Sequence, residues 1–119
     1  MSQISPFEAS DLLQKLFDER TPVTAFLMTP SRARLRFNGF IVGATKEGGL
    51  FIGDRLLPDA PSNWINVFPF GEGECTFVYG EKREITADVR LLLTTDVGES
   101  ALTIRFIVTD EILTLFFTL

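Results

Sequence analysis

Arg32, Arg34 and Arg36 place three of the eleven basic residues of this chain within five positions. Residues two apart on a strand point to the same side, so these guanidinium groups would form a row. Such a row could bind a phosphate or a carboxylate through paired hydrogen bonds, and Lys46 could add a donor if the next turn brings it close. The alternative is a solvated strand face that keeps an edge from pairing with another chain. We favour this alternative because solvated rows of charge are common on protein surfaces.

Few other residues in the sequence could make or break covalent bonds. The absence of histidine excludes Ser-His-Asp and Cys-His catalysis and a zinc site with histidine ligands. Three pairs of carboxylates fall where we expect turns or strand ends: Asp18 with Glu19, Glu72 with Glu74, and Asp110 with Glu111. Charges at such positions are usually solvated. We therefore predict that the protein is not an enzyme and uses no metal and no cofactor.

Length and composition predict a single domain over residues 1–119. A chain of this size can bury enough surface to fold without a disulfide or a metal. The lone cysteine, Cys75, fits a reducing compartment, and the N-terminus lacks the basic and apolar pattern of a signal peptide. We therefore expect a cytoplasmic protein that does not associate with membranes. The net charge of −5 makes nucleic acid an unfavoured partner.

The N-terminal segment carries the signals of one α-helix, over about residues 6–19. Ser5 can cap it, Pro6 suits its first position, and Glu8 completes a capping box. The helix should end before Pro22, because a proline disfavours helical geometry in the residue that precedes it. The apolar residues at helical spacing are Ala9, Leu12, Leu13, Leu16 and Phe17.

From Val23 onward the apolar pattern changes to a period of two, which is typical of strands. The alternation over residues 32–37 is lost beyond Asn38, and a bulge at Gly39 would explain the change. Residues 54–63 should form the longest loop. The other expected strands are 23–28, 50–52, 64–68, 74–79, 83–94, 101–108 and 111–119, joined by turns at 29–31, 48–49, 80–82 and 96–99. The fold class is therefore mainly β, with one N-terminal helix and a barrel or sandwich of seven or eight short strands.

The large apolar residues indicate a core and an interface. We expect Trp64 and most of the twelve phenylalanines to be buried, because each removes a large apolar area from water. Cys75 begins an apolar strand and should be a small core residue. The segment from Ile112 to Leu119 is apolar on both faces. It is either a central, covered strand or a surface that packs against another chain, so a protein partner or self-association is expected.

The order of these segments resembles the N-terminal PilZ-like domain of bacterial flagellar brake proteins. The resemblance is carried by LLQKLFDERTPVTAFL, RFNGFIVGATKEGGLFIGD, WINVF and ECTFVYGEKREI, and it covers about residues 12–106. It implies a single PilZ-like split β-barrel with one N-terminal α-helix. It also implies a regulatory or protein-interaction role in bacterial cyclic di-GMP-linked signalling that governs motility or surface behaviour.

The nucleotide-binding motifs of the wider PilZ family are degenerate in this chain. That family binds cyclic di-GMP through an RxxxR segment and a [D/N]xSxxG turn. Over residues 44–49 of this sequence only the final glycine of that turn agrees, with Ala44 in place of the acid or amide and Lys46 in place of the serine. We therefore predict a module that does not itself bind the nucleotide. The alternative is a nucleotide receptor that uses Arg32, Arg34, Arg36 and Lys46.

A second resemblance leads to a different class of function. A helix that leads through ERTPVTAFL into bent strands is also similar to the opening of bacterial Sm-like RNA chaperones. Those proteins end after about five strands, and the acidic charge of this chain is unsuited to RNA. An Sm-like RNA-binding module therefore ranks below the PilZ-like interpretations.

Overall fold

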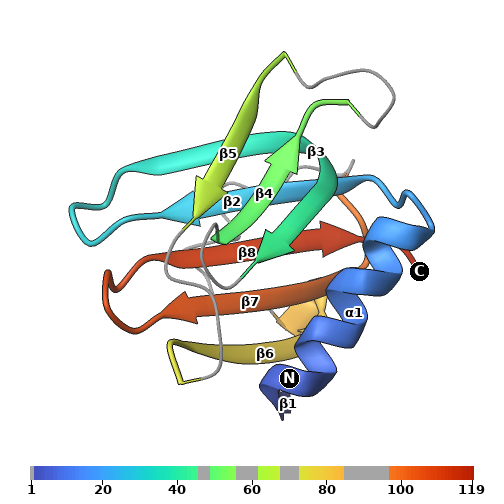
Figure 1. The fold of residues 1–119 in the computed structure, drawn as a ribbon. Coiled ribbons are helices and arrows are strands. Elements are labelled where there is room, and N and C mark those ends of the chain that lie inside the picture. Colours follow the sequence, from blue (N-terminus) through green and yellow to red (C-terminus); the bar gives the residue numbers. More distant parts are fainter. Residues whose placement is uncertain (1, 46–48, 56–61, 68–72, 85–96) are drawn as a thin grey trace.

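The computed structural model describes residues 2–45, 49–55, 62–67, 73–84 and 97–119 (Figure 1). Within these ranges the fold is mainly β with one α-helix, which confirms the predicted fold class. The elements are β1 (Ser2–Ile4), α1 (Pro6–Asp18), β2 (Val23–Met28), β3 (Arg34–Thr45), β4 (Gly49–Gly53), β5 (Trp64–Val67), β6 (Cys75–Glu81), the 3-10 helix η1 (Lys82–Glu84), β7 (Ser100–Phe106) and β8 (Ile112–Phe117).

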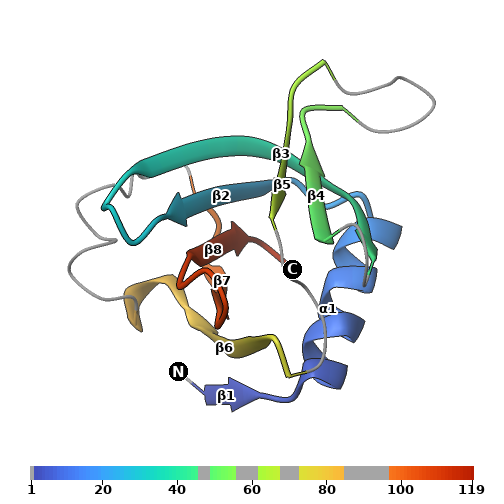
Figure 2. The same ribbon diagram turned by 60° about the vertical axis from the view of Figure 1, so that its left-hand side comes forward.

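The described strands form one antiparallel sheet in the order β1-β6-β7-β8-β2-β3-β4-β5. Figure 2 shows this sheet curling around a core, with α1 against the open side between β6 and β3. The two outermost strands, β1 and β5, do not pair with each other. The result is a small barrel that is not closed.

Helix α1 begins at the predicted cap. The Glu8 backbone N–H donates to Ser5 Oγ at 3.1 Å, and the Ser5 backbone N–H donates to Glu8 Oε1 at 3.2 Å. Ala9, Leu13 and Leu16 are buried against the sheet, as their spacing predicts. The helix therefore closes the barrel by the apolar stripe that its sequence shows.

Strand β8 lies in the middle of the sheet, between β7 and β2. All of its residues from Leu113 to Phe117 are buried. Leu113, Leu115 and Phe117 belong to the main core, whereas Phe116 packs on the opposite side of the sheet with a smaller apolar cluster. The apolar C-terminal segment is thus a central, covered strand, which was the first of its two expected roles.

Strand β3 links the two parts of the sheet, because its first half pairs with β2 and its second half with β4. The bulge predicted at Gly39 was wrong, since the register shifts between Ile41 and Gly43. Gly39 is needed for another reason. A Cβ atom on it would lie 2.2 Å from the carbonyl oxygen of Gly53, so the two strands could not approach so closely with any side chain there.

Two predicted boundaries around β6 were also wrong. Gly80 and Glu81 continue β6 by pairing with Ala101 and Ser100, so they do not form a turn. The predicted strand over residues 83–94 begins instead with Arg83 in η1, and its remainder from residue 85 lies outside the described residues. For Gly80 and Glu81, pairing with β7 decided the conformation.

The N-terminal strand β1 was not predicted, because three residues carry too little periodicity to indicate a strand. It pairs with β6 through Ser2 and Tyr79. Cys75 is buried, as expected. Within the described residues, no helix is long and apolar enough to cross a membrane.

Trp64 was expected in the core, and this was wrong because its residue surface is 59% exposed. It begins β5, the last strand of the sheet, which has a neighbour on one side only. Its partner across the strands is Gly53, which has no side chain to pack against it.

Candidate functional site

The turn between β2 and β3 determines which of the three arginines share a face. The Thr29 N–H donates to the Ala33 carbonyl at 3.0 Å, and the Arg32 N–H donates to the Thr29 carbonyl at 2.9 Å. Arg32 has a φ of 66°, in the left-handed region, as is typical of the last residue in a three-residue hairpin loop. The predicted alternation therefore starts at Arg34, and Arg32 lies in the turn rather than in the row.

Arg34 and Arg36 form a pair on the side of the sheet that faces away from the main core. Arg34 is paired across the strands with Met28, and Arg36 with Phe26. The Arg36 guanidinium lies over the Phe26 ring, with Cζ 5.6 Å from the ring centroid, in a cation–π contact. We call the surface of Arg34, Arg36 and Met28, which lies over the buried Phe26 ring, the basic face.

The basic face rests on a rigid aromatic base. Phe26 packs edge-on against Phe116 of β8, with ring centroids 5.6 Å apart and an interplanar angle of 85°. Val97 and Ala101 complete this buried cluster. Because Phe26 is fixed from below, its contact with Arg36 restricts the positions that the guanidinium can take.

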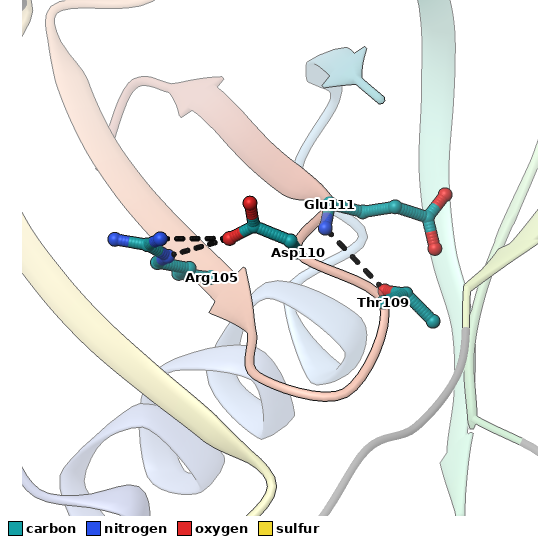
Figure 3. Close-up of polar contacts among 4 residues, drawn as sticks. All are labelled: Arg105, Thr109, Asp110 and Glu111. Atoms are coloured by element: carbon teal, nitrogen blue, oxygen red, sulfur yellow. Dashed lines mark hydrogen bonds and ion pairs between the residues drawn. The ribbon is translucent and has the colours of Figure 1, made fainter. Parts of the chain in front are cut away.

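A third arginine reaches the same side of the sheet but is neutralised. Arg105 lies in the same row across the sheet as Arg34, because Arg34 pairs with Met28, Met28 with Ile112, and Ile112 with Arg105. The distance between the two arginine backbones is three strand spacings, or about 14 Å. Its Nε and Nη2 atoms donate to Asp110 Oδ1 at 3.1 and 2.7 Å (Figure 3). Asp110 lies in the turn between β7 and β8, where the Glu111 N–H also donates to Thr109 Oγ1.

Arg34 differs from Arg105 in that it is exposed without such a partner. Among the described residues, no carboxylate lies within ion-pair distance of its guanidinium. The exposed Arg34 guanidinium can therefore bind a carboxylate or a phosphate.

The other predicted site residue, Lys46, lies outside the described residues. Lys46 follows Thr45, the last residue of β3, whereas Arg34 is the first residue of the same strand. Thr45 is therefore not next to the arginine pair in sequence or along the strand. Phe26 was missed by the sequence reasoning. The signal was present, because a turn at residues 29–33 pairs residue 28 with 34 and residue 26 with 36.

One carboxylate away from the basic face links the residues that follow β4 to those that precede β5. Asp54 accepts hydrogen bonds from the Ser62 N–H at 2.9 Å, and from the Asn63 N–H and side-chain amide at 3.1 and 3.2 Å. Burial alone raises the pKa of Asp54, but these hydrogen bonds and the nearby Arg55 outweigh it. The pKa of Asp54 therefore lies below its ordinary value of 3.8.

The described carboxylates do not gather into a metal-binding cluster. Within the parts of the chain that the structure describes, no three acidic or cysteine side chains lie close enough to hold a metal ion. Asp110 instead pairs with Arg105, and Glu72 lies outside the described residues.

Fold and site together define a small, mainly β domain with one helix near its N-terminus and an arginine pair on an outer sheet face. No protein-family model matches the chain, and no curated protein or solved structure matches it.

Proposed function

We propose that this chain is a non-enzymatic interaction module of the PilZ-like type, which binds a partner protein in bacterial cyclic di-GMP-linked signalling. The basic face is the contact surface, and an acidic surface of the partner is its complement. The partner would present a carboxylate to Arg34. Such contacts between arginine and carboxylate provide specificity and speed association.

The observation that carries this proposal is the exposed guanidinium of Arg34 on a protein of net charge −5. Asp110 forms an ion pair with Arg105, whereas among the described residues no carboxylate forms one with Arg34. Arginine is enriched at protein interfaces and at their energetic centres.

The PilZ-like part of the proposal is supported by where the resembling segments lie. The GLFIG segment is β4, and CTFVYGE is β6. The helix precedes β2, in the order that the resemblance implies. These are likenesses of order and pattern, so the family assignment stays a proposal.

The absence of nucleotide binding is part of the same proposal. Arg32 and Arg36 have the spacing of the RxxxR segment, and Ala44 lies eight residues beyond Arg36 on β3, which is up to about 26 Å of extended strand. Ala44 also stands where the PilZ turn has an acid or amide. A single cyclic dinucleotide would therefore not receive both parts of the family motif. Calorimetric titration with cyclic di-GMP should give no binding heat, and micromolar or tighter binding would overturn this part.

The interaction role is tested with three versions of the full chain as bait. Wild type, Arg34→Glu and Arg55→Glu are each used for affinity purification from bacterial lysate, with quantitative mass spectrometry. Arg55 is an exposed arginine outside the basic face and serves as the matched control. We expect a protein that wild type and Arg55→Glu recover and Arg34→Glu loses, and that salt also releases. Recovery of the same proteins by all three baits would contradict the proposal.

A further inference from the structure

A row of outward-facing side chains continues the basic face across the four central strands of the sheet. Arg34 pairs with Met28, Met28 with Ile112, and Ile112 with Arg105. Directly paired residues of antiparallel strands point to the same side of a sheet, so we call these four residues the outer row. The row begins at an exposed arginine, crosses two half-buried apolar side chains, and ends at the arginine that Asp110 binds.

An exposed isoleucine widens the apolar part of the outer row. Ile107 follows Phe106, a core residue, and its N–H donates to the Glu74 carbonyl at 2.9 Å, so strand pairing continues to this point. Successive residues of a strand point to opposite sides, so Ile107 lies on the outer side next to Arg105. The residue surface of Ile107 is 54% exposed, and that of Val108 in the same turn is 76% exposed. Exposed apolar side chains that adjoin one another are typical of interaction sites.

The strands under the outer row determine what form of segment can lie on it. β2, β8 and β7 each have a strand on both sides, so they cannot accept an added strand. An extended segment laid on this face would leave its own N–H and C=O groups unpaired against apolar side chains. A helix pairs these groups internally, and helices commonly pack on sheet faces. The partner segment that fits this face is therefore a helix.

The spacing of the outer row matches one face of a helix. Neighbouring strands are about 4.8 Å apart, so the members of the row follow one another at about that interval. One turn of an α-helix rises about 5.4 Å, so residues i, i+4, i+7 and i+11 follow one another on one face at nearly the same interval. A helix that lies across the strands can therefore place one side chain on each of them.

The two ends of the outer row differ in charge. Among the described residues, Arg34 forms no ion pair with a carboxylate, whereas Asp110 binds Arg105 at 2.7 Å. Figure 3 shows the Glu111 carboxylate directed away from the pair of Arg105 and Asp110. Arg34 therefore selects an acidic side chain at one end of the helix, and the end on β7 needs none.

We propose that the partner protein contacts the outer row through an amphipathic helix that lies across β3, β2, β8 and β7. The helix places an aspartate or glutamate on Arg34, and its apolar side chains at i+4 and i+7 lie on Met28 and Ile112. A third apolar side chain, at i+11, lies on β7 beside Ile107. This inference rests on the proposed function, because it names the form of the segment that the basic face binds.

The test uses three helical peptides, stapled on the face away from the contact, and measures their binding to the full-length chain by fluorescence anisotropy. The first has glutamate at i and leucine at i+4, i+7 and i+11, with alanine and glutamine elsewhere. The second has the same composition with the glutamate moved to the opposite face, and the third has lysine in place of the glutamate. We expect wild type to bind the first peptide at least about fivefold more tightly than either of the others. Equal binding of the three peptides, or binding of none, would overturn the proposal.

Charge reversal at Arg34 identifies the residue that the glutamate of the peptide contacts. Arg34→Glu should weaken the binding of the glutamate peptide about tenfold and should bind the lysine peptide more tightly than the glutamate peptide. Arg55→Glu, which changes an exposed arginine outside the basic face, should keep the wild-type affinities. An Arg34→Glu chain that still prefers the glutamate peptide would overturn the proposal.

An exposed apolar residue tests the far end of the helix. Ile107→Gln should weaken the binding of the glutamate peptide at least about threefold, because it removes apolar contact area on β7. Phe7→Gln is the matched control and should have no effect, because Phe7 is 76% exposed on α1 rather than on the sheet. Unchanged binding by Ile107→Gln would overturn the placement of the helix across β7.

The peptide measurements and the affinity purification fail independently. A partner that wild type recovers and Arg34→Glu loses, combined with no binding of the glutamate peptide, would reject the helix and retain the basic face as the contact surface. A partner recovered equally by both baits would instead contradict the proposed function itself.

Discussion

Arg32 occupies a backbone conformation that glycine and asparagine adopt more easily than arginine. Its φ of 66° places it in the left-handed region at the end of the β2–β3 turn. For a residue with a Cβ atom, this conformation costs about 1 kcal/mol or more. Arg20 and Asp110 share this conformation, with φ of 53° and 57°, so positive φ occurs at several turns of this chain.

The first prediction concerns the stability cost of Arg32. Arg32→Gly should raise the free energy of unfolding by about 0.5–1 kcal/mol, because glycine adopts positive φ without a steric penalty. Urea unfolding of the full chain measures it. Arg34→Gly is the control and should be destabilising, since Arg34 lies in a strand. A loss of stability in Arg32→Gly would show that the arginine side chain stabilises the turn.

The second prediction concerns pH and the Asp54 carboxylate. Because its pKa is lower in the folded protein than its ordinary value of 3.8, ionised Asp54 stabilises the closed loop ends. This stabilisation is fully present at pH values above the ordinary pKa of Asp54. It is lost as the pH falls through the lower pKa that Asp54 has in the folded protein. A carbon-detected NMR titration of Asp54 should give a midpoint below 3.8, with the amide signals of Ser62 and Asn63 shifting together with it. A midpoint at or above 3.8 would contradict the assignment of these hydrogen bonds.

At the scale of the elements, β3 changes its pairing partner at Gly39. Replacing a glycine of this strand with alanine should therefore change the stability by different amounts at Gly39 and at Gly43. At Gly39 a Cβ atom would lie 2.2 Å from the Gly53 carbonyl oxygen, whereas at Gly43 it would meet nothing within 4 Å. Gly39→Ala should therefore destabilise the protein by about 1–3 kcal/mol. Gly43→Ala should be neutral or slightly stabilising. Equal effects of the two substitutions in urea unfolding would show that the strands do not cross so closely at Gly39.

The elements that local signals determine were predictable from the sequence. The capping box of Ser5 and Glu8 fixes the start of α1, and the Thr29-Pro30-Ser31 turn fixes the β2–β3 hairpin. Elements that depend on distant pairing were not. Strand β1 exists through β6, and the exposure of Trp64 follows from the place of β5 at the edge of the sheet.

The candidate site was half predictable for the same reason. Alternation correctly placed Arg34 and Arg36 on one face, but it could not show that Arg32 leaves the strand through a left-handed turn residue.

At the scale of the whole molecule, the proposed contact surface has the opposite sign to the net charge of the chain. The basic face lies on the outer side of β2 and β3. A net charge of −5 makes the overall field repel acidic partners, so binding to the basic face depends on close contacts rather than on long-range attraction. Arg34 should therefore have a large effect on binding.

The most direct test of the interaction role is the dissociation constant of the recovered partner, measured by calorimetry with wild type, Arg34→Glu and Arg55→Glu. We predict that Arg34→Glu weakens binding by about tenfold or more, because it replaces an attractive contact with a repulsive one. Arg55→Glu should bind within about twofold of wild type, because mutation of a charge outside the interface has little effect on affinity. Equal dissociation constants for wild type and Arg34→Glu would contradict the assignment of the basic face as the contact surface.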